Sequence, residues 1–151
     1  MAGFPAGRYP GRVKTILMPI DLAISPGSTL RRAREMLRPE ERWKVLLLGT
    51  FHGPFLPLSR SVAIHDELKR KTLERLASQR DEIQGREEFQ DFDFELLTYM
   101  GSLDNGLHYL SQEQKVDCLL LDAELGSHKE ELGRVLSKID CPVLIIPSVD
   151  R

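Results

Sequence analysis

The 151-residue chain predicts an α/β protein with one doubly wound, five-stranded parallel sheet and helices on both of its faces. Three observations lead to this prediction. Short apolar runs alternate with helical patterns along the chain, which is typical of parallel strands joined by right-handed crossovers. The second run is continuously apolar, as in strands that are covered on both faces. The third run alternates polar and apolar residues, which indicates an edge strand, so we expect the strand order 3-2-1-4-5.

The chain begins with a segment that we expect to be a flexible leader. Residues 1–12 contain three glycines and two prolines without any periodicity, so a single domain is expected over residues 13–151. Its first strand is predicted over Val13–Pro19. A helix follows from about Pro26 to Arg38, because Ser25 suits an N-cap position before a proline in the first turn.

The middle of the chain predicts two further strands separated by a long helix. The run Lys44–Thr50 reads as a buried strand. After a loop with two prolines and a glycine, a strongly charged helix is expected from Ser61 to about Gln84. In Phe92–Tyr99 the acidic residues Asp93 and Glu95 lie on one face of the alternation, as expected for an edge strand.

The last part of the chain repeats the alternation. A helix is expected over Ser102–Gln114 and a buried strand over Val116–Leu121. Ser127 and Glu130 have the spacing of a capping box, which predicts that the next helix starts there. A Cys-Pro pair ends that helix, and Val143–Ile146 is the predicted fifth strand.

The composition excludes several classes of protein. Lys and Arg total 21 against 23 Asp and Glu, so the formal net charge is -2, and we expect no nucleic-acid partner. No apolar run approaches the roughly 20 residues that span a bilayer, so we expect no membrane partner. Cys118 and Cys141 form neither a disulfide framework nor a zinc site, which favours reduced thiols in a cytoplasmic protein.

Four segments in the predicted order resemble the universal stress protein (UspA-like) family. The first strand ends in an Ile-Leu-Met-Pro-Ile-Asp sequence over residues 16–21, and the second strand contains the apolar run Val45–Leu48. The fourth strand has the Val-Asp-Cys-Leu-Leu-Leu sequence of residues 116–121, and Cys141–Ile146 matches the Cys-Pro-Val-Leu signature. The resemblance covers about residues 13–147.

The resemblance implies a homodimer that pairs through its fifth strand. The expected interface residues are Val143, Leu144, Ile145 and Ile146. A short apolar edge strand is an aggregation hazard unless another strand covers it. An unidentified protein partner is a further expectation.

Many members of that family bind ATP through Gly-x-x-Gly, nine residues, and then Gly-Ser or Gly-Thr, and this sequence departs from the motif. Asp122 stands at the first glycine position and Lys129 and Glu130 at the Gly-Ser positions, with six residues between Asp122 and Lys129 instead of twelve. A second alignment uses Gly126 and Ser127 as the Gly-Ser pair, but the preceding loop is still too short. We therefore expect no bound cofactor, with ATP or AMP as the alternative.

The other end of the expected ligand cleft is better preserved. Pro19, Asp21 and Val45 match the positions around the adenosine of a bound nucleotide, and Gly126 and Ser127 complete the candidate ligand-binding set. Asp21 could equally satisfy backbone N–H groups in its own loop, so both interpretations stay open.

No residue pattern predicts catalysis. There is no Gly-x-Ser-x-Gly elbow, and none of the four histidines, which are His52, His65, His108 and His128, has a metal-ligand spacing with a cysteine or a second histidine. We expect no catalytic residues and no metal. The first hypothesis is a non-enzymatic, dimeric stress-response or regulatory protein that acts through protein contacts. The alternative is a sensor of an adenine nucleotide or another small metabolite in the residual cleft.

Overall fold

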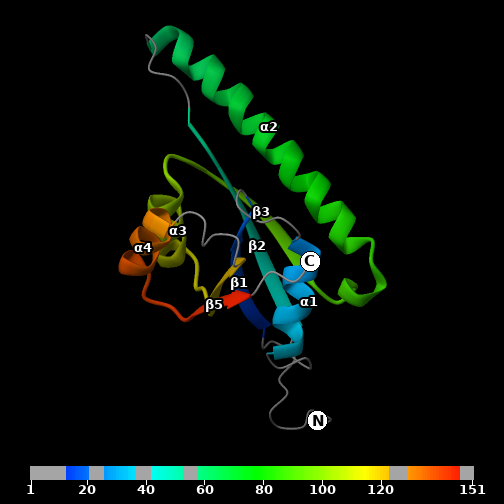
Figure 1. Cartoon of the computed structure of the whole chain (residues 1–151). Helices are drawn as coiled ribbons and strands as arrows, with labels where there is room; N and C mark the ends of the chain where they lie inside the picture. The colour runs from blue at the N-terminus through cyan, green and yellow to red at the C-terminus, as the bar shows by residue number, and fades with distance from the viewer. Residues whose placement is uncertain (1–12, 21–25, 37–41, 53–57, 123–128, 147–151) are drawn as a thin grey trace.

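The computed structural model describes residues 13–20, 26–36, 42–52, 58–122 and 129–146. Strands and helices alternate as the sequence predicts (Figure 1), in the order β1 (Val13–Pro19), α1 (Pro26–Met36), β2 (Arg42–Phe51), α2 (Leu58–Gln84), the short 3-10 helix η1 (Glu87–Phe89), β3 (Asp93–Met100), α3 (Leu103–Glu113), β4 (Cys118–Asp122), α4 (Lys129–Lys138) and β5 (Val143–Ile146). The expected leader and the capping serine of the last helix lie outside the described residues.

The five strands form one parallel sheet in the order β3-β2-β1-β4-β5, which confirms the predicted fold class. Successive side chains of a strand point to opposite faces. On β1, Ile16 and Met18 join a core with Leu30 of α1 and Leu76 of α2, whereas Leu17 joins a second core with residues of α3 and α4. Figure 1 shows α1 and α2 on one side of the sheet and α3 and α4 on the other. The expectation that helices cover both faces is therefore confirmed.

Element boundaries differ from the predictions where polar residues take part in the sheet. β2 extends from Arg42 to Phe51, beyond the predicted run Lys44–Thr50, because Arg42 pairs with Val13 of β1 and Phe51 pairs with Met100 of β3. Arg42 and Lys44 also form 3.1 Å ion pairs with Asp93 and Glu95 of β3. α2 begins at Leu58, three residues before Ser61. The alternating strand starts one residue later than predicted, because Phe92 is buried in an aromatic cluster instead of pairing with β2.

Two arginines of α1 hold the connection between α2 and β3 against the domain. Arg31 makes a two-bond contact with the carboxylate of Glu88, with distances of 2.7 and 2.6 Å. Arg34 donates to the Glu88 carbonyl at 2.7 Å, forms a 3.0 Å ion pair with Asp91, and lies 4.9 Å from the centre of the Phe92 ring. These arginines therefore serve an internal contact between segments that are far apart in the sequence.

The turn from β3 to α3 requires glycine. Gly101 has a φ of 141°, and its N–H donates to the Phe51 carbonyl at 2.9 Å. A Cβ atom at this position would lie 2.8 Å from Cε2 of Tyr99. Glycine adopts this backbone region without the strain that a side chain would introduce.

We expect the substitution Gly101→Ala to lower the free energy of unfolding by about 2 kcal/mol, because it combines backbone strain with a steric conflict. Urea denaturation measures the loss. Gly133→Ala in α4 is the matched control, since a Cβ atom there would meet no heavy atom within 4 Å. This control should stabilise the protein by roughly 0.5–1 kcal/mol through helix propensity. Equal effects of the two substitutions would contradict the prediction.

Candidate functional site

The carboxyl ends of β1 and β4 mark the point where the strand order reverses, because β2 and β3 are added on one side of β1, and β4 and β5 on the other. β1 pairs with β2 on one side and with β4 on the other. The chain leaves β1 for α1 on one face and leaves β4 for α4 on the opposite face. In open α/β sheets, ligands bind outside the carboxyl ends of the strands at such a switch point. The candidate site is therefore built from the ends of β1 and β4 and from the start of α1.

The structure places only part of the predicted ligand-binding set. Pro19 is buried at the end of β1 and pairs in register with Leu48. Val45 lies three positions earlier on β2, where it pairs with Ile16, and its side chain is fully buried in the core beneath α1 and α2. The register therefore separates Val45 from Pro19 along the sheet. The other three predicted residues, Asp21, Gly126 and Ser127, lie outside the described residues, so their ligand role stays a prediction.

Asp122 connects the end of β4 to the first turn of α1. One oxygen of its carboxylate, Oδ2, accepts a hydrogen bond of 3.2 Å from the Thr29 hydroxyl. Thr29 has only 4% of its surface exposed, and its neighbours Pro26 and Gly27 are buried as well. A negatively charged side chain therefore lies at the switch point itself, held by a buried polar partner. Counting along the sequence singled out Asp122, but no local signal pointed to Thr29, which lies 93 residues away.

A second carboxylate is buried between α3 and α4. Asp104 has 4% of its surface exposed, and its Oδ2 lies 2.7 Å from Nζ of Lys138. Lys138 also donates to Oδ1 of Asn105 at 2.7 Å. The hydrogen bond from Lys138, together with one from Ser102, lowers the pKa of Asp104 to about 2. Because this carboxylate is paired with a cation inside a helix contact, its arrangement indicates a structural role. Sequence reasoning did not find it.

The thiols are not arranged for nucleophilic chemistry. Both cysteines are free, and burial raises the pKa of Cys118 and that of Cys141, which disfavours the reactive thiolate. Cys118 belongs to the core beneath α1 and α2, whereas Cys141 packs against the core on the other face. Each thiol therefore acts as a small apolar side chain.

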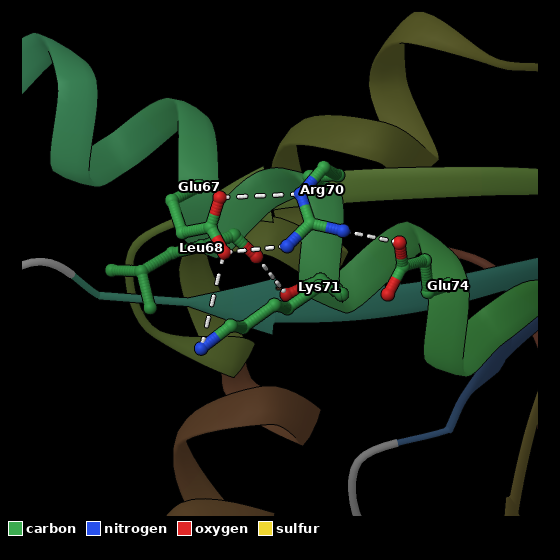
Figure 2. Close-up of polar contacts among 6 residues, drawn as sticks. Glu67, Leu68, Arg70, Lys71 and Glu74 are labelled. Carbon is green, nitrogen blue, oxygen red and sulfur yellow. Dashed lines mark hydrogen bonds and ion pairs between the residues drawn. The ribbon is translucent and has the colours of Figure 1, made fainter.

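The charges of α2 neutralise one another along the helix (Figure 2). Arg70 lies between Glu67 and Glu74 and forms ion pairs with both, and Lys71 approaches Glu67 at 4.0 Å. Pairs spaced three or four residues apart stabilise exposed helices. In Figure 1 the start of α2 projects beyond the ends of the strands. The pairing indicates a self-supporting helix surface rather than a reactive site.

At the far edge of the sheet, β5 pairs only with β4 among the described strands. Val143 and Leu144 are half-buried and Ile146 is buried. Ile145 exposes 41% of its surface. This edge therefore presents apolar side chains together with a strand that has one open side.

The part of the chain that the structure describes offers neither a metal cluster nor a membrane-spanning helix. There, no group of three or more His, Cys, Asp or Glu side chains is arranged to hold a metal ion. No helix in these segments has the length and apolar character needed to cross a membrane.

The sheet order and the switch point define a doubly wound α/β protein. Solved structures show which members of this class have a similar fold. The hypothetical protein PH0823 superimposes with a TM-score of 0.67 at 23% identity, over 91% of this chain and 97% of its own. UspA from Lactobacillus plantarum gives 0.63 at 15% identity, over 89% and 98%. The universal stress protein family protein At3g01520 of Arabidopsis thaliana, solved with AMP bound, gives 0.57 at 14% identity, over 90% and 92%.

The chain has the fold of the universal stress proteins. No family model and no curated protein matches the sequence. The likeness at these identities concerns the fold alone.

Proposed function

We propose that this chain is a divergent universal stress protein that acts without catalysis, as a cytoplasmic regulatory homodimer, and that it does not bind ATP. The observation that carries the proposal is the short connection after Asp122. Only six residues separate it from Lys129, and its carboxylate is held by Thr29 at the switch point. A loop of this length offers few backbone N–H groups to a triphosphate, and a carboxylate at its start repels one.

The free energy lost with the phosphate contacts is large enough to prevent ATP binding at micromolar concentration. Hydrogen bonds to charged groups contribute roughly 1.5–3 kcal/mol each. The loss of two or three phosphate contacts therefore costs about 3–9 kcal/mol. Since about 1.4 kcal/mol changes an affinity tenfold, a micromolar ATP site would weaken to millimolar or beyond.

The open side of β5 supports the dimer. An exposed edge strand offers unpaired N–H and C=O groups, and proteins normally protect such an edge. The four residues of β5 carry no charge, and Ile145 exposes 41% of its surface. Pairing with β5 of a second copy would cover both the backbone groups and these side chains.

A second candidate function is the sensing of a small adenine-bearing ligand. The similar Arabidopsis protein has AMP bound. In this chain Pro19 ends β1 at the switch point, two residues before Asp21 in the sequence. These residues support a ligand that lacks a triphosphate.

Native mass spectrometry of the freshly purified protein tests the proposal. We expect twice the chain mass of 17.2 kDa, no added mass from a nucleotide, and no stoichiometric ATP binding at micromolar concentration. Ile145→Asp should convert the dimer to a monomer. Val62→Asp on α2, where Val62 is 56% exposed, is the matched control and should remain dimeric. A monomeric wild-type protein or a bound ATP would contradict the proposal, and a bound adenine monophosphate would favour the sensor.

A further inference from the structure

The connection between α2 and β3, residues 85–92, is held to the domain differently from the helices around it, and we call it the strap. Its backbone–backbone hydrogen bonds run within the strap or to the last turn of α2, as in the bonds from Gly85 to Asp81 and from Phe92 to Phe89. Among the described residues, none of these bonds reaches the sheet or α1. Segments with few tertiary hydrogen bonds open locally at a lower free energy than the whole domain.

Exposed ion pairs from α1 hold the strap in place. Arg31 binds the carboxylate of Glu88 through bonds of 2.7 and 2.6 Å. Arg34 donates to the Glu88 carbonyl at 2.7 Å and forms a 3.0 Å ion pair with Asp91. The side chains of Arg31 and Glu88 are 43% and 38% exposed. Dissolved salt therefore screens their attraction, as it does for other exposed charges.

An aromatic cluster with an unsatisfied hydrogen-bond donor lies beneath the strap. Phe89 and Phe92 are buried, and the centre of the Phe92 ring lies 5.3 Å from that of the fully buried Trp43. The indole Nε1–H of Trp43 has no hydrogen-bond partner. A buried donor without a partner is unfavourable, and contact with water removes this cost. The closed strap therefore carries a penalty that offsets part of the gain from burying the aromatic rings.

We propose that the strap is a salt-sensitive lid over Trp43, held closed by Arg31 and Arg34 and released when dissolved ions screen these arginines. When the lid opens, Phe89 and Phe92 leave the cluster while the five-stranded sheet stays folded. The aromatic surface then becomes accessible at high ionic strength. This inference depends neither on the dimer nor on a bound nucleotide.

Hydrogen exchange of single backbone amides, followed by NMR on the full chain, tests the lid in about 0.05 M and about 1 M NaCl, where the screening lengths differ several-fold. The amides of Phe89 and Phe92, each hydrogen bonded within the strap at 3.1 Å, report its opening. The amide of Leu47 reports unfolding of the sheet, because β2 lies between β1 and β3 at this residue.

Glu88→Gln weakens the closure, and Glu67→Gln is the matched control. In low salt we expect the strap amides of Glu88→Gln to exchange about three-fold or more faster than those of the wild type, because Arg31 loses its charged partner. Glu67→Gln removes the same charge on α2, where it breaks the exposed pair with Arg70. Its strap amides should exchange at the wild-type rate.

In the wild type, we expect the higher salt concentration to speed exchange of the strap amides about three-fold or more while the Leu47 amide changes less. The effect of salt should be smaller in Glu88→Gln. Strap amides that exchange as slowly as Leu47 would show that the strap opens only when the whole domain unfolds, and would overturn the inference. Equal salt effects in Glu88→Gln and the wild type, or the same acceleration in Glu67→Gln as in Glu88→Gln, would overturn it as well.

Discussion

Replacing Leu76 by alanine should lower the free energy of unfolding by about 3 kcal/mol, because it leaves a cavity in the core between α2 and the sheet. Leu76 has no exposed surface. It packs closely on β2, where a Cβ atom at Gly49 would lie 3.3 Å from its Cδ1 and 2.7 Å from Cγ2 of Thr72. The helix and the strand are therefore closely packed at Leu76, and the truncation removes contacts from both.

Urea denaturation followed by tryptophan fluorescence measures this loss. Trp43 is the single tryptophan of the chain, is fully buried, and belongs to the same core as Leu76. Val62→Ala is the matched control on the same helix, where the side chain is 56% exposed and the cost should stay within about 0.5 kcal/mol. A comparable cost at both positions would mean that the start of α2 is packed in solution, contrary to the structure.

The periodicity of the sequence was sufficient to predict the fold, because each strand and helix shows its environment locally. The alternation of Phe94 and Leu96 with Asp93 and Glu95 predicts an edge position for the third strand, and among the described strands it pairs with β2 alone. The predicted ends of a strand are less accurate where residues of another strand extend it. Arg42 extends β2 because it pairs with Val13 of β1, and no pattern within β2 itself reveals that partner.

The candidate site could be predicted only in part, since its contacts join residues that are distant in the sequence. The length of the connection after Asp122 is visible in the sequence, whereas its contact with Thr29 depends on how α1 lies on the sheet. The position of Val45 likewise depends on a residue that is distant in the sequence. Its apolar run correctly placed it on a strand, but the register with Ile16 determines that it lies deep in the sheet.

The pair of Asp104 and Lys138 should be the most important polar contact between α3 and α4. We expect Lys138→Met to lower the free energy of unfolding by about 2–3 kcal/mol at neutral pH, because it leaves a carboxylate buried without its main partner. Arg134 lies farther away, with Nε at 4.0 Å from Asp104, and compensates for only part of the charge. The double variant Asp104→Asn with Lys138→Met should recover some of the loss.

The pH dependence of stability provides a readout that lost packing alone would not change. The pKa of Asp104 falls from 3.8 to about 2 on folding, so its ionised form stabilises the native state. This contribution is fully present above about pH 4 and is lost as the pH falls towards 2, and it amounts to about 1–2 kcal/mol. Urea denaturation between pH 6 and pH 2 should show this loss in the wild type and much less of it in Lys138→Met.

Lys44→Met, which breaks the exposed 3.1 Å pair with Glu95, is the control and should cost less than about 1 kcal/mol. Identical pH profiles for Lys138→Met and the wild type would show that Lys138 does not hold the pKa of Asp104 down, and the proposed link between α3 and α4 would then be wrong.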